Sequence, residues 1–98
     1  MQFDRDKFAE ALGSTFVIKS ADGRTLDLEL KEVSEIRERP HQQSFSIVFL
    51  VPESFTVEQG LFDIEHESLG GMQLFLVPVG MNDSRMMLEA VFNTLRES

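Results

Sequence analysis

Apolar and polar side chains take alternate positions through most of the chain from Phe16 onward. Because successive side chains of an extended strand point to opposite faces, a period of two predicts strands that each bury one face. Residues 25–31 give the clearest case, with Leu26, Leu28 and Leu30 pointing inward and polar residues between them. The pattern limits the chain to folds in which extended strands bring their apolar faces together.

Six segments with this pattern are expected to be strands. They are residues 15–19, 25–31, 44–51, 61–66, 72–79 and 86–93. The connections are short, and Asp22 with Gly23 favours a tight turn, so sequential strands are expected to pair as antiparallel hairpins. We therefore predict a mainly β fold of about six antiparallel strands that closes into a small barrel, with a two-sheet sandwich as the alternative.

A short N-terminal helix is predicted over residues 4–12. Asp4 suits the N-cap position, and Gly13 suits the end of the helix. Phe8 and Leu12 lie four residues apart, so they share a helix face and are expected to dock on the rest of the fold.

Two irregularities are expected among the strands. Val33 falls out of phase with the leucines before it, which predicts a bulge or strand end near Glu32. Residues 35–43 are polar and contain Pro40, so they are predicted to form a mobile loop.

Length and charge bound the class of protein. Ninety-eight residues suffice for one core, so we expect a single domain over residues 1–98. A net charge of −8 disfavours binding to nucleic acid and to anionic membranes. The absence of cysteine excludes disulfides, thiolate nucleophiles and cysteine zinc sites. With no signal peptide and no long apolar run, the chain is expected to be soluble and cytoplasmic.

Several short motifs occur in an order that resembles a known family. They are Gly60 to His66, Leu69 with Gly70, Leu74 to Gly80, Glu89 to Asn93, and, earlier, Leu26 to Leu30 and Phe45 to Phe49. Over nearly its whole length the chain resembles the DUF6916 type, a small bacterial domain family of unknown function. The resemblance implies a structural or assembly role, associated with phage-tail-like proteins, and no assigned activity. The chain departs from that pattern at Phe62 and Leu88, where tyrosine is expected.

Asp63, Glu65, His66 and Glu67 together suggest a metal site. In a strand, however, His66 faces the interior while the three carboxylates face water. We therefore expect no metal site. His66 is predicted to be a partly buried structural histidine, held by a hydrogen-bond acceptor near the turn at residues 68–71.

No catalytic arrangement is evident in the sequence. Asp27 with Glu29 is a typical carboxylate pair on a solvated strand face, whereas acid–base catalysis needs carboxylates in a cleft. Ser44, Ser46 and Ser68 lack the Gly-x-Ser-x-Gly elbow of a hydrolase, and the glycines lack the lysine of a phosphate-binding loop. The sequence predicts a protein that is not an enzyme and has no cofactor.

Outward apolar residues indicate a partner surface. If Ile47 and Phe49 face the core, Val48 and Leu50 face away from it, and Val17 does the same on the first strand. We expect these side chains to be covered by the N-terminal helix, by the connection at residues 53–60 or by another subunit. Burying several of them is enough to hold a dimer or a protein partner.

A basic spot at Arg37 and Arg39 is a second candidate for partner contact. The leading hypothesis is therefore a non-catalytic interaction or assembly module that binds a protein partner or a second copy of itself. The alternative is a small-ligand-binding barrel whose mouth is lined by phenylalanines and His66.

Overall fold

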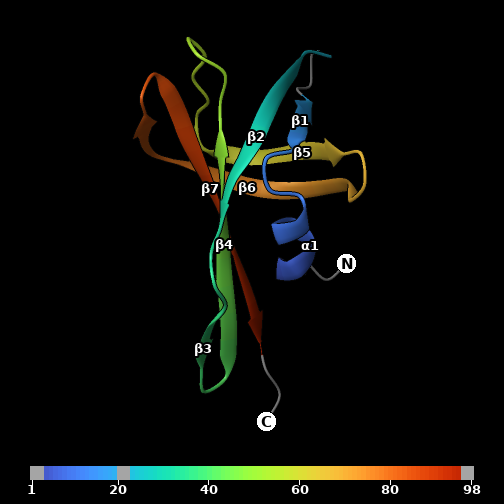
Figure 1. Ribbon diagram of the computed structural model, residues 1–98, viewed down its shortest axis with the longest axis vertical. Helices are drawn as coiled ribbons and strands as arrows, with labels where there is room; N and C mark the ends of the chain where they lie inside the picture. Colours follow the sequence, from blue (N-terminus) through green and yellow to red (C-terminus); the bar gives the residue numbers. More distant parts are fainter. Residues whose placement is uncertain (1–3, 20–22, 96–98) are drawn as a thin grey trace.

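The computed structural model describes residues 4–19 and 23–95 of the chain (Figure 1). Its elements are α1 (Arg5–Glu10), β1 (Thr15–Lys19), β2 (Thr25–Val33), β3 (Arg37–Arg39), β4 (Gln42–Leu50), β5 (Gly60–His66), β6 (Gly70–Asn82) and β7 (Arg85–Leu95). The six expected strands are all present, although most start earlier or end later than the alternation predicts.

Six strands of the described chain close into an antiparallel barrel. Going round it, β1 pairs with β2, β2 with β4, β4 with β7, β7 with β6, β6 with β5, and β5 again with β1. The pairing of β2 with β4 completes the ring. The prediction of a barrel is therefore confirmed, and the sandwich alternative is wrong.

Apolar side chains from every strand of the ring fill the barrel. The largest fully buried ones are Phe16, Phe49, Leu28, Leu30, Ile47, Ile64, Leu76, Leu88 and Val51. Phe16 and Phe49 meet edge to face, with their ring centroids 5.1 Å apart. Among the described residues no polar or charged residue is buried.

Helix α1 lies in the angle between the β5–β6 hairpin and the long β4–β7 pair (Figure 1). The Asp4 side chain caps it by accepting a hydrogen bond from the backbone N–H of Asp6 at 2.9 Å. Phe8 is buried and stacks on Phe92 of β7, with ring centroids 5.4 Å apart. A helix this short depends on such packing rather than on its own backbone. In the described part of the chain, no helix is long and apolar enough to cross a membrane.

The prediction that Leu12 shares the buried face of the helix is wrong. The helix ends at Glu10, Ala11 is its C-cap, and Leu12 is 47% exposed. A spacing of four residues brings side chains together only while the helix continues. Ala11 is buried instead, and Gly13 turns the chain with φ of +82°.

The prediction of a loop over residues 35–43 is wrong at residues 37–39. Arg37–Arg39 forms β3, which pairs with the first residues of β4, from Gln42 to Ser44. All three β3 side chains are exposed. Charged side chains are a common protection of edge strands, so the polar composition here marks an edge strand rather than a loop.

The bulge expected near Glu32 is confirmed. The register between β2 and β4 shifts between Leu30 and Glu32. The bulge lets β2 bend round from β1 to β4 and so helps to close the barrel.

Strands β4 and β7 continue beyond the barrel as a long arm, with β3 along the other side of β4 (Figure 1). β7 stays paired with β4 as far as Leu95. On its other side β7 pairs with β6 only as far as Val77–Glu89, and the rest of β6 pairs with β5.

Candidate functional site

His66, the last residue of β5, joins three segments by hydrogen bonds. Its Nδ1 accepts from the backbone N–H groups of Ser68 and Leu69, both at 3.1 Å. Its Nε2 lies 2.8 Å from the hydroxyl oxygen of Ser14. The half-buried ring also packs on Phe16, with ring centroids 4.3 Å apart.

These partners determine where the ring carries its proton. Because Nδ1 accepts two N–H groups, the proton of the neutral ring is on Nε2, which donates to Ser14 Oγ. The Ser14 hydroxyl in turn donates to the backbone carbonyl of Ala11. A serine nucleophile needs the opposite direction, with its hydroxyl donating to the histidine. Ser14 and His66 are therefore arranged as a structural link.

The position of His66 fits a structural histidine beside the turn at residues 68–71, with one difference. The turn donates hydrogen bonds to the ring, whereas an acceptor was the expectation. Ser14 was not predicted as a partner, since 52 positions separate it from His66 and only the pairing of β1 with β5 brings them together.

The carboxylates of β5 point away from His66. Asp63 accepts a hydrogen bond from Gln73 at 3.1 Å, and Glu65 forms an ion pair with Lys19 at 2.7 Å, both on the exposed face. Alternation along β5 thus separates the histidine from the carboxylates, as predicted. Within the described residues, no group of three or more metal-ligating residues comes together.

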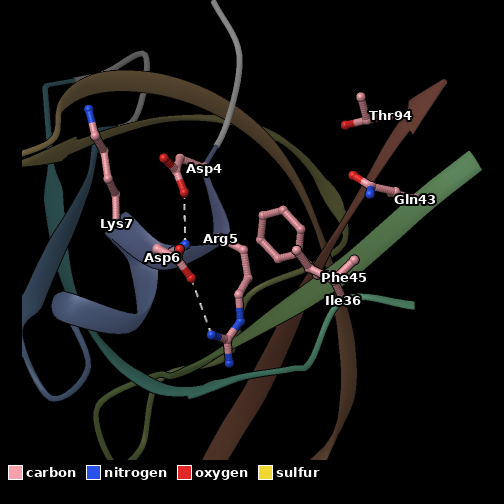
Figure 2. A pocket seen from close by; sticks show the side chains of 8 residues that line it. All are labelled: Asp4, Arg5, Asp6, Lys7, Ile36, Gln43, Phe45 and Thr94. Carbon is pink, nitrogen blue, oxygen red and sulfur yellow. Dashed lines mark hydrogen bonds and ion pairs between the residues drawn. The ribbon is translucent and has the colours of Figure 1, made fainter. Parts of the chain in front are cut away.

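A groove of about 390 Å³ lies between α1 and the arm. Figure 2 shows Arg5 and Asp6 on the helix side and Phe45 on the side of β4. Arg5 already donates to the carbonyl of Ser34 at 2.9 Å and contacts Asp6 and Glu35 at 3.5 and 3.4 Å. The bonds to Ser34 and Glu35 attach the helix to the connection between β2 and β3.

A larger groove of about 590 Å³ opens near the β1–β2 hairpin. Its apolar lining includes Leu26 and Phe62, which are half-buried, and Phe55, which is 56% exposed. Arg24 and Glu58 bring one charge of each sign to the same groove. An apolar hollow with a few polar groups is the usual form of a small-molecule site.

His66 does not belong to that groove. It lines a separate hollow of about 330 Å³ beside Lys7 and Glu10 of α1. The structure therefore does not bring His66 together with Phe55 and Phe62, since Phe62 and His66 lie at opposite ends of β5.

Val48 and Leu50, which were expected to face away from the core and to be covered, are buried within the single chain. They are only 8% and 7% exposed. In the barrel register Val48 lies between Glu32 of β2 and Glu89 of β7, and Leu50 lies beside Met87. Side chains directly opposite one another are close enough to touch, so these long neighbours account for the burial. Their cover comes from neighbouring strands of the same chain, so little of either side chain is left to contact a partner.

The other predicted contact residues lie on separate elements. Val17 is half-buried on β1, whereas Arg37 and Arg39 are exposed on β3. Strands β1 and β3 are not neighbours, so the structure does not bring these residues into one surface.

Two large apolar side chains face solvent together on the outside of the β5–β6 hairpin. Leu61 and Phe75 are directly opposite in the register and are 61% and 52% exposed. Asp63 and Glu65 continue the same face of β5. The sequence signals Phe75, since residues 72–79 are apolar on both faces, but only the register reveals Leu61 as its neighbour.

Together these features define a small closed antiparallel barrel with one short helix packed against it in the described part of the chain. A family model described as a domain of unknown function (DUF6916) matches residues 3–92. The chain belongs to this family, as the resemblance of its motifs predicted. No curated protein and no solved structure matches the chain.

Proposed function

We propose that the chain is a non-catalytic interaction module that binds a protein partner through the outer face of β5 and β6. The observation that carries this proposal is the exposed pair of Leu61 and Phe75. Large apolar side chains that meet water side by side are typical of contact surfaces, because burying them in a partner is favourable. An assembly role in phage-tail-like structures, which the family resemblance implies, is compatible with this proposal.

The polar groups of the described residues support a non-catalytic role. The side chains of Ser14 and His66 form hydrogen bonds with backbone groups and with each other. Asp63 and Glu65 lie on an exposed strand face and not in a cleft. General acid–base chemistry needs such groups to converge in a cleft, and these do not.

The chemistry beside the apolar pair indicates the kind of partner. Asp63 and Glu65 lie on the same face as Leu61, and the whole chain has a net charge of −8. A matching surface needs an apolar side chain to insert between Leu61 and Phe75, with basic residues around it.

The test is capture of partners from an extract of the source organism with three forms of the chain. The variant Leu61→Ser with Phe75→Ser removes the proposed contact. The variant Val79→Ser with Met81→Ser removes two side chains that are also about half exposed, at 48% and 59%, and serves as the matched control. We expect the first variant to lose the partner and the control to keep it, with both folded like wild type. Equal capture by both variants contradicts the proposal, and so does the absence of any partner enriched by wild type.

A second function has one specific observation in its favour, the apolar groove of about 590 Å³ near the β1–β2 hairpin. We propose as the alternative that this groove binds a small apolar ligand. Ligand pockets of drug-sized molecules have volumes of roughly 300–1,000 Å³.

The alternative is tested by an NMR titration with apolar fragments of about 10 to 20 non-hydrogen atoms. We expect the shifts to gather at Leu26, Phe55 and Phe62, and Phe55→Ala to weaken binding because Phe55 is an exposed part of the lining. Shifts scattered over the barrel, or binding unchanged in Phe55→Ala, count against a ligand site here.

A further inference from the structure

The far half of β7 is an open strand edge. β7 is paired with β4 along its whole length, but its pairing with β6 stops at Glu89. Figure 1 shows this part of β7 running past α1 alongside β4. From Ala90 to Thr94, no other strand among the described residues pairs with the second side of β7.

One hydrogen bond fixes which residues point their backbone groups at that edge. The N–H of Val51 donates to the carbonyl of Met86 at 2.9 Å, so the even-numbered residues of β7 bond to β4. The odd-numbered residues point the other way, in agreement with the position of Pro78, which has no N–H, opposite the even-numbered Leu88. Beyond Glu89, Val91 and Asn93 therefore direct their N–H and C=O groups away from β4, in the plane of the sheet and toward its open edge.

This edge lacks the usual protection against strand pairing. The opposite edge of the same arm, β3, carries two arginines and a glutamate and is followed at once by Pro40. Charged side chains and proline are common means of preventing edge-to-edge association. The β7 edge from Ala90 to Thr94 has neither, and Val91 is 58% exposed.

We propose that two copies of the chain associate through β7, with the two strands antiparallel about a two-fold axis. The backbone groups of Val91 and Asn93 bond to β7 of the second copy. The two arms then form one continuous sheet in the order β3, β4, β7, β7, β4, β3. Antiparallel pairing of identical strands is self-complementary and ends at the dimer, because it uses up both open edges.

Charge distinguishes this dimer from one held by ion pairs. Each copy has a net charge of −8, so two copies repel each other at low ionic strength. The contact from Ala90 to Thr94 is itself uncharged. Salt screens the repulsion and leaves the hydrogen bonds intact, so this dimer becomes stronger with salt, whereas a dimer held by ion pairs becomes weaker.

The test is sedimentation equilibrium from about 10 µM to about 1 mM protein, a range that detects weak dimers. Val91→Pro removes the outward N–H without removing a bond to β4, and Val91→Ala keeps that N–H while shortening the side chain. We expect wild type to dimerise, Val91→Pro to weaken the dimer at least about tenfold, and Val91→Ala to weaken it much less. A wild type that stays monomeric at the highest concentration, or a dimer that Val91→Pro leaves unchanged, overturns the proposal.

Amide hydrogen exchange of wild type gives a second readout that does not depend on the variant folding. At low concentration the amides of Val91 and Asn93 should exchange fast while those of Ala90 and Phe92 are protected. At high concentration Val91 and Asn93 should become protected too, and exchange that does not change with concentration overturns the proposal.

The variant Leu61→Ser with Phe75→Ser should still dimerise. Loss of the dimer in that variant overturns the proposed association through β7, but it does not contradict the proposed partner contact on β5 and β6.

Discussion

At the scale of single residues, His66 shows how hydrogen bonds fix a half-buried polar side chain beside the apolar core. Its two ring nitrogens have opposite roles, one accepting from the turn at Ser68 and Leu69 and the other facing Ser14. Each partner is supplied by a different segment, so the ring ties the end of β5 to the start of β1. The hydrogen bonds fix the ring in one orientation and one tautomer.

The first prediction concerns that tautomer. Long-range ¹H–¹⁵N correlation spectra of neutral His66 should show the proton on Nε2, because Nδ1 accepts from two backbone N–H groups. Ser14→Ala leaves the Nε2 proton without its partner and should lower the free energy of unfolding by about 1–3 kcal/mol. Ser68→Ala, which keeps the backbone N–H that contacts the ring, is the control and should change stability by less than about 0.5 kcal/mol. A spectrum with the proton on Nδ1 contradicts the assignment.

The residue scale also shows where sequence reasoning reached its limit at the candidate sites. The alternation along β5 was enough to place His66 on one face and Asp63 with Glu65 on the other. It could not supply Ser14, which lies 52 positions away, nor the pairing of Leu61 with Phe75. Both depend on which strands become neighbours and in which register, and a period of two does not specify either.

At the scale of elements, α1 depends on the barrel for its stability. It has six residues, far fewer than a helix needs to persist alone in water. Phe8 joins it to an aromatic group, with ring centroids 5.4 Å from Phe92, 6.2 Å from Phe45 and 6.3 Å from Phe16. Aromatic contacts of this kind add to the benefit of burial itself.

The second prediction follows from that packing. Phe8→Ala should lower the free energy of unfolding by about 3–5 kcal/mol, because it removes a fully buried ring and leaves a cavity. Leu12→Ala removes a side chain that is 47% exposed and should cost much less. Denaturant unfolding followed by far-ultraviolet circular dichroism measures both. Equal losses in the two variants contradict the observed end of the helix at Glu10.

Strands with a strong alternation were the elements that the sequence predicted best. The expected strand at residues 15–19 coincides with β1, and the bulge near Glu32 came from a break in the same pattern. β3 was missed because all three of its side chains are polar and exposed. An edge strand that buries no side chain leaves no periodic signal, since only its backbone takes part in the sheet.

At the scale of the whole molecule, barrel closure explains why Val48 and Leu50 are buried although they face away from the core. The sequence correctly assigned them to the face opposite Ile47 and Phe49, but it gave no information on what stands beside them. β4 has β2 on one side and β7 on the other, and both bring long side chains to the outer surface around Val48. A strand with a neighbour on each side in a closed barrel can therefore bury side chains on both of its faces within one chain.

The third prediction concerns how that closure is reached. The ring needs the pairing of β1 with β5, in which Phe16 lies opposite His66, and of β4 with β7, in which Phe45 lies opposite Phe92. Pairings between residues so far apart in the sequence require large loops to close before any contact is gained, so folding should take milliseconds to seconds. The chain has no tryptophan and no tyrosine, so stopped-flow circular dichroism is the suitable measurement.

Phe16→Leu removes the ring that contacts both Phe49 and His66, so it weakens the contact between β1 and β5 inside the barrel. It should slow folding if that pairing forms in the transition state. Folding complete within microseconds contradicts an order of events in which these distant strands must meet first.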